Sequence, residues 1–189
     1  MENRLKELCS VNSEMQEKYY LYCQIKKALT ERLRTVPAYF PHFSIHDASH
    51  SSNIIKYLSM LLGRDNIEKL SVSDLLVLCV AAYAHDISMS VSYEMIHEKM
   101  TSDEWKETLK KYTKSQQEEL ADIAERLLRF PDIKKDVIAL DIYSDVLYVI
   151  EENFRAEHAK RSAKEILENS DLEKLFGIRM RNVLAEVCR

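Results

Sequence analysis

Histidines and aspartates occur beside two of the most apolar stretches of the chain. The stretch FSIHDASHSSNIIKYL, residues 43–58, places His46, Asp47 and His50 at the start of an apolar run. The stretch AAYAHDISM, residues 81–89, places His85 and Asp86 directly after another one. Neutral imidazoles and carboxylates together form a suitable ligand set for a transition-metal ion or Mg²⁺. These residues therefore predict a divalent-metal site, provided that the fold brings the two stretches together.

Each of these residues also has an ordinary interpretation. The dipeptide His85-Asp86 is too short to be specific, and a histidine there can cap the carbonyls at a helix C-terminus. His46 can belong to a surface loop. Asp47 can orient His46 or His50 as a supporting carboxylate, or it can cap a helix. The metal hypothesis therefore requires His50 to lie near His85 and Asp86.

Another histidine stands among basic residues in NFRAEHAKRSAKEIL, residues 153–167. Arg155 and Arg161 each lie three residues from His158, so on a helix they border it on one broad face. Together with Lys160 they could hold the oxygens of a phosphate group beside a metal ion that His158 helps to bind. A solvated charged face, with local ion pairs to Glu157, accounts for the same residues.

Helical periodicity dominates the segments that must position these residues. The chain of 189 residues has only 2 Gly and 3 Pro, which argues against the many turns of an all-β protein. Residues 37–47 are predicted to form a loop because Pro37 and Pro41 interrupt the pattern. Residues 137–150 are rich in β-branched and aromatic side chains, so a strand is the alternative there. Helices are expected at about 13–35, 50–62, 73–85, 91–100, 102–112, 115–129, 133–152, 153–168 and 171–188.

Composition narrows the class of protein. The net charge of −4 and the pI of about 5.9 give no general basic surplus for nucleic-acid binding. None of the four cysteines forms a CxxC pair, so we expect reduced thiols rather than a zinc ribbon or a disulfide framework. The N-terminus is charged, and the longest apolar run, residues 75–84, is about half of a membrane span. A cytoplasmic protein that binds no membrane is expected.

The quoted motifs resemble those of a known superfamily. His50 followed by His85-Asp86 is similar to the start of the HD-domain motif of metal-dependent phosphohydrolases. The blocks YFPHFSIHDASHSSNII, LSVSDLLVLCVAAYAHDISM and FRAEHAKRSAKEIL resemble more closely the HD domains of bacterial conflict and defence systems, which are often joined to GHKL-type ATPase modules. The resemblance implies an all-α bundle of roughly eight helices at 39–189, preceded by an N-terminal helical extension at 1–38.

The same resemblance implies the roles of individual residues. His50, His85 and Asp86 would be metal ligands, with Asp86 also in the catalytic role, and His46 and His158 would complete or support the set. The expected cofactor is a divalent metal (Mn, Fe, Co, Ni, Zn or Mg), and the expected reaction is hydrolysis of a phosphate ester of a nucleotide or nucleic acid by a metal-activated water.

Two departures from the motif keep a second function open. Ser88 stands where the resembled motif, HDIGM, has glycine. The motif also ends with a late aspartate, and no residue of this chain matches it. Asp141 and Asp145 lie four residues apart, which would place them on one helix face. They could supply a carboxylate to the site, or they could belong to a solvated face. We therefore expect either a fragment truncated at its C-terminal end or an incomplete site. The alternative to an enzyme is a non-catalytic module that senses a ligand or docks a partner such as an ATPase domain.

Overall fold

The computed structural model describes residues 1–40, 48–130 and 140–189. Within these ranges the chain forms α-helices, one short 3-10 helix, η1, and no strand, so the all-α prediction is confirmed. Four elements carry the candidate site: α4 (Ala48–Leu62), α6 (Val72–Ala84), η1 (Ile87–Met89) and α10 (Leu140–Glu168). The other helices are α1 (Glu2–Cys9), α2 (Ser13–Leu33), α3 (Val36–Tyr39), α5 (Arg64–Lys69), α7 (Tyr93–Thr101), α8 (Glu104–Tyr112), α9 (Glu118–Leu128) and α11 (Ser170–Val187).

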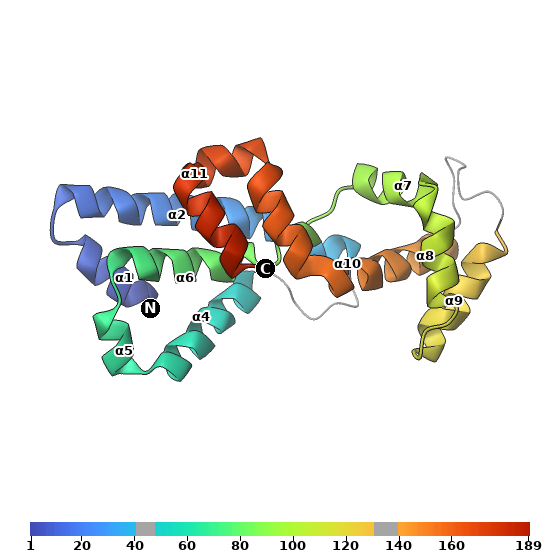
Figure 1. Cartoon of the computed structure of the whole chain (residues 1–189), viewed down its shortest axis with the longest axis horizontal. Coiled ribbons are helices and arrows are strands. Elements are labelled where there is room, and N and C mark those ends of the chain that lie inside the picture. Colours follow the sequence, from blue (N-terminus) through green and yellow to red (C-terminus); the bar gives the residue numbers. More distant parts are fainter. Residues whose placement is uncertain (41–47, 131–139) are drawn as a thin grey trace.

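The helices form an elongated molecule with two hydrophobic cores (Figure 1). The first core, here called core A, joins α1, α2, α4, α6, α11 and the C-terminal end of α10. The second, core B, joins α7, α8, α9 and the N-terminal half of α10 with the end of α2 and with α3. The long helix α10 runs through both cores and connects them (Figure 1). The segment Asp86–Met89 lies at the junction, since Ile87 belongs to core A and Met89 to core B.

Helix α6 forms the centre of core A. Its start is fixed by a capping box, in which the Ser71 hydroxyl and the Asp74 carboxylate each accept a hydrogen bond from the other residue's backbone N–H. Its body is apolar on all sides, which suits a helix surrounded by others. Helices α1, α2, α4 and α11 all pack against it. This packing fixes the position at which α6 ends, and His85 is its C-cap residue.

Helix α10 is continuous where two helices were expected. It carries the segment for which a strand was the alternative, and residues 140–150 of that segment are helical, so the strand alternative is wrong there. Helix α11 kinks at Gly177, whose φ of 71° lies in the left-handed region that favours glycine. Residues 41–47, most of the predicted loop, lie outside the described residues. Helix α3 occupies residues 37–39, so the loop prediction is wrong there. Helix α5 was not expected, and α1 was not singled out within the expected N-terminal helical extension.

Helix α4 packs against α6 through part of its apolar face. Ile55 is buried in core A, and Ile54 packs against that core from a half-buried position. Leu61 does not take part in this contact and is 83% exposed. The N-terminal end of α4 approaches the end of α6, whereas its C-terminal end leads into α5 (Figure 1). The α4 end that bears His50 is therefore the one held at the site.

One window of the described chain, Val72–Met89, is long and apolar enough to cross a membrane by length and composition. Its mean hydropathy is 1.4, and 67% of it is buried inside the molecule. The central helix of a folded core passes the same test, and α6 occupies most of this window. The window is therefore weak evidence for a membrane span.

Candidate metal centre

The structure brings His50, His85 and Asp86 together. One ligand atom from each side chain lies within 4.8 Å of the other two. Asp86 Oδ2 is 2.9 Å from His85 Nε2 and 3.5 Å from His50 Nε2. Two donors about 2.1 Å from a common ion stand roughly 3.0–3.4 Å apart at angles of 90–109°, so this spacing is close to that of a ligand set. The condition set by the sequence, His50 near His85 and Asp86, is met.

The end of α6 is what allows two consecutive residues to face the same point. On a continuous helix their side chains would diverge by about 100°. Here His85 caps α6 with helical backbone angles, and Asp86 leaves the helix with φ −105° and ψ 14°. The Asp86 side chain is thereby directed at the imidazoles, and the residue is only 2% exposed. A buried carboxylate needs cationic or hydrogen-bonding neighbours, because burial disfavours its charge.

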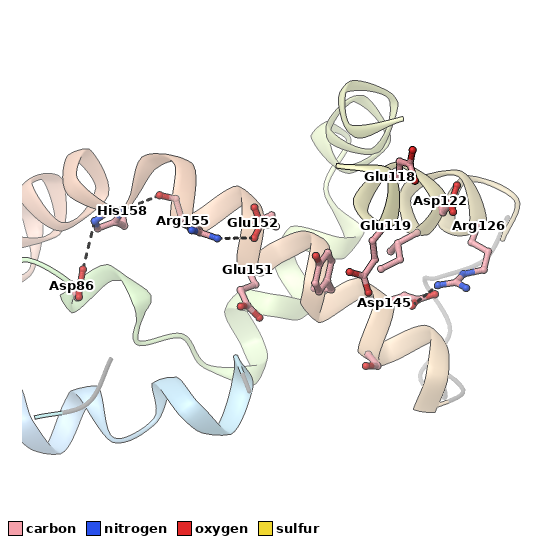
Figure 2. A pocket seen from close by; sticks show the side chains of 13 residues that line it. Asp86, Glu118, Glu119, Asp122, Arg126, Asp145, Glu151, Glu152, Arg155 and His158 are labelled. Carbon is pink, nitrogen blue, oxygen red and sulfur yellow. Dashed lines mark hydrogen bonds and ion pairs between the residues drawn. The ribbon is translucent and has the colours of Figure 1, made fainter. Parts of the chain in front are cut away.

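A third imidazole, from α10, faces the same carboxylate. His158 Nε2 is 3.6 Å from Asp86 Oδ1, and Figure 2 shows the two side chains pointing toward each other. His158 is about seventy residues from Asp86 in the sequence, so only the packing of α10 beside η1 places it here. His46 and Asp47 lie outside the described residues, and their roles stay predictions.

Backbone hydrogen bonds fix the tautomers of two of these histidines. His85 Nδ1 is 3.1 Å from the carbonyl oxygen of Ala82, and His158 Nδ1 is 2.8 Å from that of Arg155. A carbonyl oxygen only accepts, so each Nδ1 carries the proton and donates it. Each Nε2 is then free to act as an acceptor or a metal ligand, which is the usual arrangement of a metal-binding histidine.

This donor set fits a divalent metal ion. In the neutral imidazoles the Nε2 lone pairs of His85 and His158 face the lone pairs of the Asp86 carboxylate, and that arrangement is repulsive. A cation among them turns the repulsion into attraction; it is either a proton on an imidazole or a metal ion. Mixed nitrogen and oxygen ligands suit Mn, Fe, Co, Ni and Zn, with Mg favouring a larger share of oxygen. The identity of the metal is not fixed by these residues.

A cleft of about 1220 Å³ opens from Asp86 and His158 and follows α10 toward α9. Figure 2 shows the side chains along it, from Asp86 and His158 at one end to Asp122 and Arg126 at the other. The Arg126 guanidinium binds the Asp145 carboxylate at 2.8 Å, and Arg155 lies 3.4 Å from Glu152. The described lining residues are Asp86, Glu118, Glu119, Asp122, Ile123, Arg126, Ser144, Asp145, Tyr148, Glu151, Glu152, Arg155 and His158.

The three basic residues predicted to bind substrate divide between two cavities. Arg155 lines the cleft together with His158. Lys160 and Arg161 line a second cavity of about 630 Å³, which shares no described lining residue with the cleft. Arg161 also lies over the Phe154 ring, 3.5 Å from its centroid, and burial lowers the pKa of its guanidinium. A substrate contact of Arg155 is compatible with this geometry, whereas Arg161 packs against core B.

Neither of the two further aspartates joins the metal ligands. Asp141 is exposed, and Asp145 is bound to Arg126. Asp145 precedes His158 by thirteen residues on α10, which corresponds to roughly 20 Å along the helix axis. Among the described residues, the only group of three or more potential ligands with this spacing is His50, His85 and Asp86.

Sequence reasoning did not identify Glu151 as part of the site. It lines the cleft and is only 4% exposed, although α10 is otherwise polar at many positions. One sequence feature could have identified Glu151: it lies seven residues before His158, which is two helical turns away on the same helix face. Cys188 lies outside the metal group and the described cleft lining, and burial, together with the negative charge of Asp86, raises the pKa of its thiol to about 12. This thiol is therefore protonated at neutral pH.

Comparison with known proteins identifies a family. The sequence model of the HD-CE family, a family of HD-domain type, matches residues 40–189. This range includes every described residue of the metal centre and of the cleft. No curated protein and no solved structure is similar enough to be matched.

Proposed function

The chain belongs to the HD-CE family, and on that premise we propose that it is a metal-dependent phosphohydrolase. The observation that carries the proposal is the convergence of His50, His85 and Asp86 at the end of a cleft. When bound there, a divalent metal ion lowers the pKa of a water and polarises a phosphoryl oxygen. A buried histidine-carboxylate group opening into a cavity is the arrangement that such chemistry needs.

The protein's own residues supply the remaining functions. His50, His85 and Asp86 would hold the ion, and the Nδ1–H bond to the carbonyl oxygen of Ala82 leaves the His85 Nε2 available as its ligand atom. His158 faces the other Asp86 oxygen and can bind the same ion, a second ion or a phosphate oxygen. Arg155, three residues before His158 on the cleft, offers a guanidinium to a phosphate oxygen.

The substrate that we propose is a small phosphorylated compound, with a nucleotide as the first candidate. The cleft volume is on the scale of small-molecule sites. Its described lining holds seven carboxylates and two arginines, which disfavours a polyanion such as nucleic acid. The amino-acid sequence of segments 41–47 and 131–139 contains three aspartates and two lysines, so these segments add no excess of basic residues. The defence-system context, an ATPase partner and a cytoplasmic location remain part of the proposal.

A non-catalytic sensing or docking module is the second candidate. It is favoured by the absence of a further carboxylate from the ligand group among the described residues. A module of this kind would still bind metal or ligand at His50, His85 and Asp86 but would not turn it over. Metal content therefore does not separate the two candidates, and turnover does.

The test compares three purified proteins: wild type, the double variant His85→Ala, Asp86→Ala, and the control His97→Ala. His97 lies on α7 and is absent from the metal group and from both cavities. Metal content is measured by elemental mass spectrometry. With added Mn²⁺, phosphate release is measured on p-nitrophenyl phosphate and nucleotides, and hydrolysis of cyclic nucleotides and single-stranded DNA is followed by chromatography of the products.

We expect near-stoichiometric metal and phosphate release in wild type and His97→Ala, and neither in the double variant. Metal binding without hydrolysis of any of these substrates would favour the non-catalytic module. No metal in wild type, even with Mn²⁺ added, would overturn both the metal site and the phosphohydrolase proposal.

A further inference from the structure

Two buried serines join the turn that follows Asp86 to the helix that carries His158. Ser88 lies on η1 and Ser162 on α10, and they are 4% and 0% exposed. The Ser88 backbone N–H donates to Ser162 Oγ at 3.2 Å, and Ser162 Oγ donates to Ser88 Oγ at 3.0 Å. Ser88 Oγ in turn donates to the carbonyl oxygen of His158 at 3.1 Å.

These three hydrogen bonds form a continuous chain that ends at the His158 carbonyl oxygen, and the donor and acceptor roles along it are consistent. Each hydroxyl donates one hydrogen bond and accepts at least one in return. A hydroxyl buried without a partner costs free energy, so each serine restrains the other in the conformation in which both are satisfied. The serine pair therefore fixes the distance between η1 and the His158 turn of α10 more specifically than apolar packing alone could.

The pair acts on both partners of the Asp86–His158 contact. Ser88 is two residues after Asp86, and its hydroxyl bonds the backbone of His158 itself. The His158 side chain is about 40% exposed, so surrounding side chains do not enclose it. Its position depends on its backbone and on the Nδ1 bond to Arg155, and Ser88 holds that backbone against the turn.

We propose that Ser88 and Ser162 are positioning residues that hold His158 against Asp86 so that His158 joins the metal ligands. The inference rests on the metal site of the proposed function, but not on turnover. Ser88 is also the position at which the chain departs from the HDIGM motif, and glycine has no hydroxyl to make this connection. The ligand is a divalent metal ion, and Mn²⁺ serves as the probe.

The test is a double-mutant cycle on Mn²⁺ affinity. Ser88→Ala and Ser162→Ala are each made in wild type and in His158→Ala, and Kd is measured by calorimetric titration. Ser90→Ala is the matched control, since Ser90 lies on the same segment but its hydroxyl bonds the carbonyl of Arg32 on α2 rather than α10. Thermal melting in EDTA checks that each variant folds, and Ser88→Thr tests whether a restored hydroxyl rescues affinity.

In the wild-type background we expect Ser88→Ala and Ser162→Ala to weaken Mn²⁺ binding about 10-fold. This value is the lower end of the affinity losses observed when residues that support metal ligands are changed. In the His158→Ala background the same changes should shift Kd by no more than about twofold, the scatter of independent substitutions. Ser90→Ala should leave Kd unchanged, and Ser88→Thr should bind more tightly than Ser88→Ala. If Ser88→Ala does not fold, the proposal is tested by the effect of Ser162→Ala on Kd in the two backgrounds.

Equal losses in both backgrounds would overturn the proposal, because the serines would then act on the Asp86 turn without His158. Unchanged affinity in both serine variants, or no Mn²⁺ binding by wild type, would overturn it as well. Because Kd is measured without substrate, failure of the phosphohydrolase proposal appears separately, as a wild type that binds Mn²⁺ and releases no phosphate.

Discussion

Core A and core B differ in how their helices are specified. Core A is built around α6, which is apolar on all sides and is covered by α1, α2, α4 and α11. Core B is built from α7, α8 and α9, each with one buried face and one polar face. The metal ligands His50, His85 and Asp86 lie at the end of core A, whereas the acidic part of the cleft is lined from α9 and α10 in core B.

The difference indicates a division of tasks between the two cores. Ligand atoms must be held to within a few tenths of an ångström, which favours a densely enclosed helix as their support. The polar faces of amphipathic helices are free to line a cavity whose residues select the substrate. We infer that changes in core A act on metal binding and that changes in the core B part of the cleft act on substrate choice.

The largest expected effect compares the carboxylates at the two ends of the cleft. Mn²⁺ should raise the Tm of wild type and of Asp145→Ala, because an ion that binds only the folded state stabilises it. Asp86→Ala should abolish this rise, since Asp86 Oδ2 lies near both His50 and His85. Differential scanning fluorimetry with Mn²⁺ and with EDTA measures the change. An equal loss in Asp145→Ala would place part of the metal site in core B.

Matched leucine truncations test whether the two cores unfold together. Leu29, on α2 in core A, and Leu109, on α8 in core B, are both fully buried. Each change to alanine should lower the free energy of unfolding by about 2–5 kcal/mol, through lost burial and the cavity left behind. Urea unfolding followed by circular dichroism should show one transition that shifts in both variants. Two transitions, each sensitive to one variant, would show that the cores are independent.

The Leu29→Ala result also bears on the N-terminal helices. Leu29 lies before the range that the HD-CE family matches, residues 40–189, yet it packs in the same core as α6. A loss of stability as large as that of Leu109→Ala would show that α2 is part of the folded unit. A change below about 0.5 kcal/mol, as at an ordinary surface position, would contradict the packing described here.

Alkaline pH should lower the stability of the folded protein through core A, because its thiols are buried. Burial, with the Glu2 charge adding to it, raises the pKa of Cys79 to about 12 from an ordinary value of 9.0. The unfolded chain releases this proton near pH 9 and the folded chain near pH 12. The associated stability is therefore complete below about pH 9 and is lost as the pH rises toward 12. Urea midpoints between pH 8 and 11 measure the loss.

The matched variant for this measurement is Cys79→Ala, which removes the titrating thiol but keeps the other alkaline groups. Its stability should fall less steeply with pH than that of wild type, whatever its stability at pH 8. Identical slopes would show that Cys79 titrates normally in the folded protein. Core B contains none of the buried cysteines, Cys9, Cys79 and Cys188.

The smallest expected effect is at the distal end of the cleft. Arg126 binds Asp145 at 2.8 Å, but more than half of its side chain is exposed. Arg126→Ala should therefore lower the free energy of unfolding by at most about 1 kcal/mol, as for other surface ion pairs. Mn²⁺ affinity should not change, whereas the relative rates with differently charged substrates should. A changed Mn²⁺ Kd would contradict the separation of the two ends.

The sequence by itself determined most of the helices and the residue types of the metal site. The capping box at Ser71 and the apolar body of α6 are local signals, because they depend on residues within one helix. The His85-Asp86 pair could be placed at the end of that helix for the same reason. The exposed Leu61 and the continuous α10 were not predicted, because packing against other elements decides them.

Only the tertiary structure decided which of the chemically suitable residues meet. His50, His85 and His158 come from three helices, and their convergence on Asp86 results from the packing of α4 and α10 around the end of α6. Arg155 and Arg161 border His158 equally in sequence, yet one lines the cleft and the other lies over Phe154. Periodicity gives the spacing of side chains around one helix axis, but the neighbours that each side chain meets depend on long-range packing, which no local pattern records.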